Sequence, residues 1–551
     1  MSTNKTATAL LALSMFFTGA SGLVNEYVLS TVSIYILGSS IEQFSITIAL
    51  MLGMMGVGSG VQKFVTDDNL IQKFVIIEIL LAVVGSFAPI IIYASFGYVE
   101  HNFALIYYSF VMFIGFLIGF EIPFIIRINE KYVQELKSNL SAIIASDYMG
   151  SLIGALIWVY WLLPYFNLNQ ISFIVSGVNF FVALISLIYF MRIGLVKFNI
   201  FKTIGILLIT ILLFYGYNNV TKWEISLEQK LYEDPIIATK TTKYQHLTLT
   251  HSQILDEYRL YINGNVQFSS LDEVRYHEML VHPVMKIVKD AKSVLILGGG
   301  DGLAIRELNK YKDIELITLV DLDPGMVAFA KNNKILKALN NGAFDNAKIE
   351  IINPKQKDTL ERKDIYKLDR DNKKELLASV RVYNIDADIF LKKILSKKYD
   401  VIIIDFPDPN SIELSKLYSK QFYLKLKKAM HSSTRVIVQS TSPYHAKESF
   451  LCIGRTLESS GIKVTPLHIN IPSFGDWGWY IGGLNTSSEL IKEKIINLDS
   501  FKVDTNFLTI ELLKASTVFG KNELLSKNQK INTLMEPVLL DIYNKNSWLY
   551  Y

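Results

Sequence analysis

The chain has 551 residues, of which 50% are hydrophobic and 19% charged, and its formal net charge is +4 at pH 7. This length is too great for one ordinary core, so at least two domains are expected. The small net charge without a basic, aromatic-rich block argues against nucleic acid as a partner, and the single cysteine, Cys452, excludes an intramolecular disulfide and a cysteine-based zinc cluster.

The first part of the chain is apolar. A membrane span needs about 20 apolar residues to cross roughly 30 Å of hydrocarbon. About seven segments qualify, near residues 8–34, 44–62, 74–97, 103–126, 139–165, 170–191 and 199–217. We therefore predict an all-α transmembrane domain over residues 1–217, in a multi-pass protein of the cell membrane with the lipid bilayer as a partner.

The orientation of this domain follows from its basic residues. Lys and Arg gather in alternate loops, which the positive-inside rule places in the cytoplasm. Seven full spans would then put the C-terminal half outside, whereas the substrates inferred below are cytosolic metabolites. We expect a cytoplasmic C-terminal half, with an additional crossing in the long first segment or a re-entrant helix elsewhere.

Four acidic residues lie within or at the edges of the apolar segments, where an uncompensated charge is costly: Glu26, Glu78, Glu121 and Asp147. They either are protonated or hydrogen-bonded near span ends, or line a passage for cationic amines.

A small β subdomain is expected after the apolar half. Residues 246–250 and 258–262 alternate as strands do, and Asn263-Gly264 supplies the positive φ angles of a tight turn. We assign residues 218–290 to a linker and this subdomain.

Strands and helices then alternate, which predicts an α/β Rossmann-like, methyltransferase-type fold over residues 291–490. A helical extension covers residues 491–551. The buried strand Ser293–Leu297 runs into Gly298-Gly-Gly-Asp-Gly302, where glycines such as Gly298 and Gly300 let backbone amides approach a nucleoside.

Two further strands also end in acids. Residues 315–320 lead to Asp321, placed to hydrogen-bond ribose hydroxyls, and residues 399–404 lead to Asp405-Phe-Pro-Asp408-Pro409. The carboxyl ends of parallel strands face one crevice. The sequence therefore predicts a nucleoside site there, the alternative being a doubly wound domain that has lost its ligand.

Several motifs in series resemble the spermidine synthase family, over roughly residues 230–485. They are Tyr244-Gln245, Asn263-Gly264 with Gln267, Asp272-Glu273, Tyr276-His277-Glu278, Gly298 to Gly302 and Asp405 to Pro409. The apolar half resembles that of the membrane-anchored subgroup. The resemblance implies an aminopropyltransferase that moves the aminopropyl group of decarboxylated S-adenosylmethionine to putrescine, giving spermidine and methylthioadenosine, without a metal or other cofactor. The resemblance leaves open whether the protein forms a homo-oligomer.

The same resemblance implies roles for individual residues. Asp405 matches the proton acceptor, Asp408 and His277 hold the amine, and Tyr276 lines its site. Asp301 holds the aminopropyl end of the donor. The contacts to the donor nucleoside are Gln245, Asp321, Asp386 and Ala387, beside Gly298 and Gly300.

The chemistry agrees with these roles. A primary amine with a pKa near 10 must lose a proton before it attacks carbon, so a carboxylate beside it is needed. A carboxylate at Asp301 attracts the ammonium of the decarboxylated donor and repels the carboxylate of ordinary S-adenosylmethionine. A methyltransferase that uses the intact donor, the second interpretation, would gain nothing from that acid.

Some positions depart from the family pattern: Pro407, Ile412 and Phe474. Because they belong to the amine pocket, another di- or polyamine stays open as the acceptor. Phe474, Trp477 and Trp479 either wall the amine channel or are ordinary core aromatics. A third interpretation is a membrane polyamine transporter or sensor whose soluble half only binds ligand. The charged residues 353–379 are interpreted as a solvated insertion.

Overall fold

The computed structural model describes residues 2–37, 40–98, 103–132, 136–197, 200–345, 349–352, 378–393 and 398–547. The chain divides into two compact units, Met1–Ile236 and Ile237–Tyr551. Of the predicted insertion at residues 353–379, all but the last two residues lie outside the described part.

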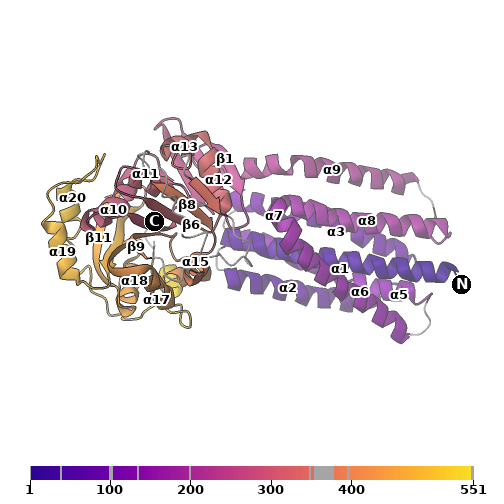
Figure 1. The fold of residues 1–551 in the computed structure, drawn as a ribbon. Coiled ribbons are helices and arrows are strands. Elements are labelled where there is room, and N and C mark those ends of the chain that lie inside the picture. The colour runs from indigo at the N-terminus through magenta and orange to yellow at the C-terminus, as the bar shows by residue number, and fades with distance from the viewer. Residues whose placement is uncertain are drawn as a thin grey trace. The chain divides into compact units, whose positions relative to one another are not determined.

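The first unit is built from helices (Figure 1). Their bounds are α1 Ser2–Leu37, α2 Ser40–Val61, α3 Leu70–Tyr98, α4 Phe103–Ile118, α5 Glu121–Asn129, α6 Leu136–Ile157, α7 Leu163–Tyr165, α8 Leu168–Arg192 and α9 Ile200–Glu228. Seven helical segments among the described residues are long and apolar enough to cross a membrane, by length and composition. They coincide with the predicted segments.

Two details differ from the expectations. The first segment, in which an additional crossing was expected, is one continuous helix of 36 residues. Helix α9 continues through residues 218–228, which the polar sequence had suggested as linker, because Trp223 and Val220 pack against Phe87 and Phe173.

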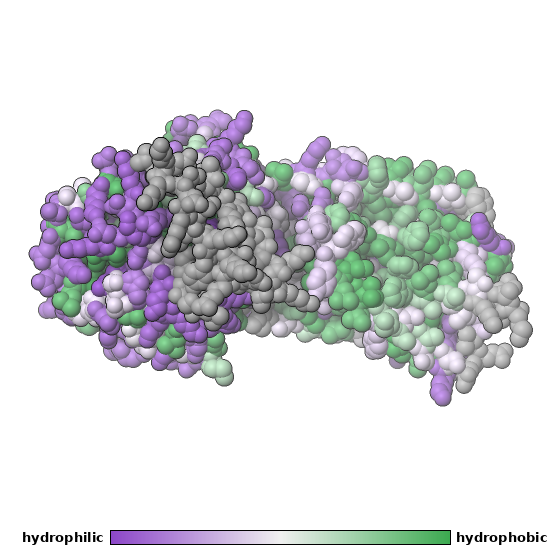
Figure 2. All heavy atoms as spheres, in the orientation of Figure 1, coloured by the Kyte–Doolittle hydropathy of each residue, from purple (hydrophilic) through white to green (hydrophobic). Residues whose placement is uncertain are grey.

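The surface of this unit is largely hydrophobic in Figure 2. On α9, for example, Phe201 is 79% and Phe214 72% exposed. In contrast to these exposed apolar side chains, the acidic side chains of Glu78 and Glu121 are buried among the helices. A passage for cationic amines along these acids stays a prediction.

The second unit begins with a sheet in the order β1-β2-β3-β4, from Ile236–Thr241, His246–Ser252, Glu257–Ile262 and Asn265–Ser269. Asn263 and Gly264 have φ angles of 50° and 81°, as the predicted tight turn requires. Leu247, Leu249 and Leu260 bury one face of this sheet against the following domain.

The main sheet has the order β11-β12-β10-β9-β5-β6-β8-β7. The strands are β5 Ser293–Gly298, β6 Leu316–Asp321, β7 Ile349–Ile352, β8 Ser379–Asn384, β9 Tyr399–Asp405, β10 Met430–Gln439, β11 Lys463–Ile471 and β12 Gly475–Gly483. All neighbours from β10 to β7 pair in parallel, and β12 pairs antiparallel with β10 and β11. The predicted Rossmann-like fold and the preceding small β subdomain are confirmed.

Helices cover both faces of this sheet (Figure 1). They are α10 Glu273–Ile287, α11 Leu303–Leu308, α12 Pro324–Asn332, α13 Lys334–Leu339, α15 Ala387–Lys393, α16 Ile412–Leu417, α17 Lys420–Leu426, α18 Lys447–Ser459, α19 Ser488–Ile496, α20 Ile510–Ala515 and α21 Val538–Asn546. From β5 the chain winds outward through β6 and β8 and later returns to the other side as β9 and β10. Such a switch point opens a crevice at the carboxyl ends of β5 and β9.

Candidate functional site

The glycine turn after β5 joins three acid-bearing segments. Gly298 lies opposite Asp405 in the parallel ladder and has a φ angle of 88°, and a Cβ there would lie 2.1 Å from the Asp405 carbonyl oxygen. The backbone N–H of Gly300 donates to Asp321 Oδ2 at 3.0 Å. A side chain at Gly298 would press on the backbone of β9, and a Cβ at Gly300 would lie 2.6 Å from Asp321 Oδ2, so both close approaches need glycine.

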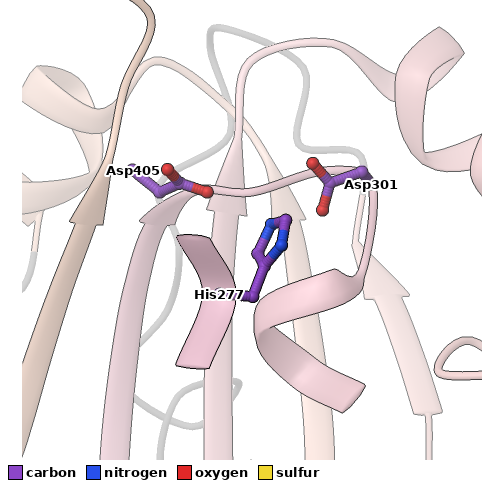
Figure 3. A group of neighbouring side chains, drawn as sticks. All are labelled: His277, Asp301 and Asp405. Atoms are coloured by element: carbon purple, nitrogen blue, oxygen red, sulfur yellow. The ribbon is translucent and has the colours of Figure 1, made fainter. Parts of the chain in front are cut away.

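Three predicted residues meet beside this turn (Figure 3). His277 from α10, Asp301 from the turn and Asp405 at the end of β9 are buried, and each has one potential ligand atom within 4.8 Å of those of the other two. One imidazole and two carboxylates so close together attract a cation, and either a metal ion or an ammonium group satisfies that requirement.

Asp405 has one oxygen bound and one available. Tyr276 donates its hydroxyl to Oδ1 at 2.5 Å, whereas Oδ2 is buried and has no hydrogen-bond partner among the described residues. Burial and then the charge of Asp301 raise the pKa of Asp405 to about 6, against the lowering effects of His277 and Tyr276. A carboxyl with this pKa can act as a general base at neutral pH.

Glu273 orients the histidine. His277 Nδ1 lies 2.8 Å from the Glu273 carbonyl oxygen and 2.9 Å from its Oε2. Burial lowers the pKa of His277, but the bond to Glu273 and the negative charges of Glu273, Asp301 and Asp405 together outweigh this effect, and the net direction is upward. Arg306 in turn donates to both carboxylate oxygens of Glu273, at 2.6 and 2.9 Å. The sequence analysis gave no role to Glu273 or Arg306, although the i, i+4 spacing of Glu273 and His277 is a signal for such a pair.

Replacing Arg306 with Met is expected to lower the free energy of unfolding by about 3 kcal/mol, because it leaves the buried Glu273 carboxylate without its bidentate partner. Thermal unfolding of the full-length chain would show a lower midpoint. Lys292→Met serves as the control, since its pairing with Glu315 at 3.6 Å is exposed on both sides and should contribute less than about 1 kcal/mol. Equal midpoints for the two variants would contradict the expectation.

Asp321 and Gln245, which were predicted to bind the donor nucleoside, are both hydrogen-bonded to Asp323. Asp321 Oδ1 accepts the N–H of Asp323 at 2.8 Å, and Gln245 donates its side-chain amide to Asp323 Oδ2 at 2.9 Å. Burial, followed by the charges of Asp323 and Asp301, raises the pKa of Asp321 to about 7. The structure therefore brings Gln245 and Asp321 together and adds Asp323, which the sequence analysis missed.

Asp386 and Ala387 lie at the start of α15. Asp386 Oδ1 accepts the N–H of Asp388 at 2.7 Å, while Oδ2 pairs with Lys416 at 3.0 Å. Ala387 is buried. Burial and then the charges of Asp323 and Asp386 raise the pKa of Tyr244, so these two carboxylates both lie near the same phenol. Asp386 therefore lies near Asp323, and the donor contacts predicted for Asp386 and Ala387 stay a prediction.

Asp408 is held by a separate set of donors. Gln439 donates to Oδ1 at 2.9 Å, and Thr441 and Tyr543 donate to Oδ2 at 2.9 and 2.8 Å. Among the described residues, the side chains that donate to Asp408 come from β10, the segment after it and α21, and His277 is not one of them. Gln439 is the last residue of β10 and Thr441 follows the strand, so polar residues at this strand end were a signal, whereas nothing in the sequence pointed to Tyr543.

Aromatic rings surround Tyr276. Its centroid lies 6.2 Å from that of Phe474 and 5.5 Å from that of Trp479. Trp477 stacks at 4.9 Å on Phe474. Asp272 accepts from the N–H and hydroxyl of Ser473, at 2.6 and 2.9 Å, and so fixes the loop before Phe474. Trp477 and Trp479 also belong to the core cluster, as the interpretation of ordinary core aromatics requires, and a role in walling an amine channel stays a prediction.

Comparison with known proteins gives a consistent result. The profile described as "Spermine/spermidine synthase domain" matches residues 273–371 and 372–494. "Polyamine aminopropyltransferase" of Oceanobacillus iheyensis is 37% identical, over 95% of this chain and 94% of its own length. The protein of that name from Leptospira interrogans is 34% identical, over 97% and 98%.

Solved structures were also compared. The crystal structure of spermidine synthase from Thermotoga maritima is 21% identical, covers 52% of this chain and 87% of that chain, and has a TM-score of 0.42. A spermidine synthase in complex with the transition state analogue AdoDATO has a TM-score of 0.43 at 21% identity, over 52% of this chain and 88% of that chain.

Proposed function

The chain belongs to the family of polyamine aminopropyltransferases with a spermine/spermidine synthase domain, and from this premise we propose that its acceptor is putrescine. Spermidine and methylthioadenosine are then the products, and decarboxylated S-adenosylmethionine is the donor. The observation that carries this proposal is the buried Oδ2 of Asp405, which has no hydrogen-bond partner in the described part of the chain and lies beside Asp301 and His277.

Asp405 acts as the base in this proposal. The amine enters as an ammonium group, which the two carboxylates attract, and donates a proton to Asp405 Oδ2. The free lone pair then attacks the methylene carbon of the aminopropyl group that is bonded to the sulfonium sulfur. The carbon–sulfur bond breaks, its electron pair returns to sulfur, and the sulfonium becomes a neutral thioether.

Positioning supplies the rest of the rate acceleration. Asp301 holds the ammonium of the aminopropyl group, with its own Oδ1 fixed by the N–H of Leu303 at 2.9 Å. Asp321, Gln245, Asp386 and Ala387 hold the nucleoside at the glycine turn. Because the leaving group is a neutral thioether that needs no Lewis acid, we propose that the reaction uses neither a metal nor another cofactor.

Product analysis tests the acceptor. The purified full-length protein would be given the decarboxylated donor with putrescine, cadaverine and spermidine together, and the products identified by mass spectrometry. We expect spermidine as the main product. A dominant product from cadaverine or from added spermidine would overturn the choice of putrescine and leave the aminopropyl transfer standing.

The pH dependence tests the base. Since Asp405 must be ionised and its pKa is about 6, kcat/KM should fall tenfold per pH unit below that value. Tyr276→Phe removes a hydrogen bond that lowers this pKa, so the acidic limb should move to higher pH. An acidic limb that stays in place in this variant would argue that another group titrates.

The membrane assignment is likewise our proposal. Seven apolar helices and their exposed side chains fit a multi-pass protein of the cell membrane. The catalytic unit would face the cytoplasm, where a nucleoside donor and amines occur. Because the first segment is one continuous helix, this orientation with the basic loops inside requires a re-entrant helix among the other segments. Protease treatment of intact spheroplasts tests this orientation: the second unit should be protected until the membrane is opened. A homo-oligomer stays a prediction.

The comparisons do not support the other two interpretations, a methyltransferase and a polyamine transporter or sensor. A methyltransferase is wrong, because the relatives that match nearly the whole chain are named aminopropyltransferases. A soluble half that only binds ligand for a transporter or sensor finds no support in those relatives either.

A further inference from the structure

Helix α21 brings a distant part of the chain to the candidate site. Leu539 and Ile542 on this helix are buried in the core cluster on one face of the main sheet. Asn532 fixes the segment before it, donating to the Ser415 carbonyl oxygen at 2.8 Å and accepting the N–H of Leu539 at 3.3 Å. The helix is therefore held against α16, the element that follows the Asp405 to Pro409 motif.

Tyr543 extends from this helix to Asp408. Its hydroxyl donates to Oδ2 at 2.8 Å. An ionised carboxylate offers about four acceptor positions. Tyr543, Thr441 and Gln439 fill three of them, which fixes the rotation of the carboxylate and leaves about one position for a further donor.

The segment between the two aspartates is fixed as well. Tyr418 donates its hydroxyl to the carbonyl oxygens of Phe406 and Pro407, at 3.1 and 3.0 Å. With this backbone held and the Asp408 side chain unable to rotate, the two carboxylates keep one separation. The two ammonium groups of a diamine are separated by a chain of set length. Two carboxylates at a fixed separation can therefore select a diamine of matching length.

We propose that Tyr543 is a specificity-determining residue for the acceptor: by holding Asp408, it fixes the point where the second ammonium of a diamine binds while the first is deprotonated at Asp405. The inference rests on the proposed function. Tyr543 differs from Gln439 and Thr441 in origin, because it lies on helix α21, whereas Gln439 ends β10 and Thr441 follows that strand two residues later. Burial raises the pKa of Asp408, and among the three donors the Tyr543 hydroxyl opposes this most strongly.

Tyr543→Phe tests the proposal on the full-length protein, with two acceptors compared. For putrescine, KM should rise about 10-fold with kcat little changed, since a hydrogen bond to a charged group is lost. For butylamine, which lacks the second ammonium, kcat/KM should be unchanged. The KM for the donor should stay as in the wild type.

Tyr423→Phe is the matched control. The Tyr423 hydroxyl is buried in α17 and has no hydrogen-bond partner among the described residues, so its removal should leave both acceptors unaffected. If Tyr543→Phe lowers kcat/KM equally for the diamine and the monoamine, or leaves the putrescine KM unchanged, the inference is overturned while the proposed function stands. A wild-type protein that uses no amine at all would instead overturn the proposed function.

Discussion

Replacing Asp405 with Asn is expected to lower turnover by roughly 10²- to 10⁴-fold, the range that general base catalysis contributes. The amide can still accept the Tyr276 hydrogen bond but cannot take a proton from the ammonium. Donor binding should persist, because the turn and Asp321 are unchanged. Release of methylthioadenosine measures turnover, and protection from thermal unfolding by the donor measures binding.

The same variant should be more stable than the wild type at neutral pH. The pKa of Asp405 in the folded state, about 6, lies above its value of about 3.9 in the unfolded chain. The folded state therefore binds more protons between these values, and its stability falls as the pH rises through them. The asparagine variant avoids this cost, so its unfolding temperature should exceed that of the wild type at pH 7.5 and lose the advantage near pH 4.

Asp400, at the opposite end of β9, supplies the control. Burial raises its pKa, but the bonds from the backbone N–H groups of Lys292 and Ser293, with those from the Ser293 hydroxyl and His431, together outweigh burial and lower it overall. Asp400→Asn should therefore destabilise the protein at neutral pH and leave kcat nearly unchanged. Opposite stability effects from two aspartates on one strand distinguish a catalytic carboxylate from a structural one. A full kcat in Asp405→Asn would refute the assigned base.

Replacing Asp301 with Asn is expected to raise the KM for the decarboxylated donor by about 10- to 100-fold, because a charge-assisted contact to its ammonium is lost. The asparagine can keep the hydrogen bond from Leu303, so the turn should stay in place. Intact S-adenosylmethionine should bind better than to the wild type, since its carboxylate is no longer repelled.

Thermal protection by each donor measures this change in discrimination. Asp313→Asn, at an exposed position between α11 and β6, should leave both donors unaffected. If the preference for the decarboxylated donor survives in Asp301→Asn, the selectivity must reside elsewhere in the site.

The parts of the site that could be predicted from the sequence are those whose residues lie within a short segment directly after a strand. Gly298 to Gly302, Asp321 and Asp405 each follow a buried strand directly, so the rule for parallel sheets placed them in one crevice. These residues come together because the sheet is parallel, and the alternation of hydrophobic strands and helices already predicts a parallel sheet.

The remaining contacts join residues that are far apart in the sequence and belong to no shared motif. Arg306 reaches Glu273 across 33 positions, and Tyr543 reaches Asp408 across 135. Neither pair has a spacing that a helix or strand would impose, because side-chain packing between separate elements decides them. For the same reason the sequence did not reveal the side chains that donate to Asp408.

The close approach at Gly298 limits how this protein can change its substrate during evolution. With the turn pressed against the backbone of Asp405, neither can shift without displacing the other. Mutations that admit a longer or shorter amine are thus tolerated more readily around β10 and α21 than at the nucleoside end. Lineages carrying this architecture would be expected to exchange acceptors while inheriting the donor unchanged.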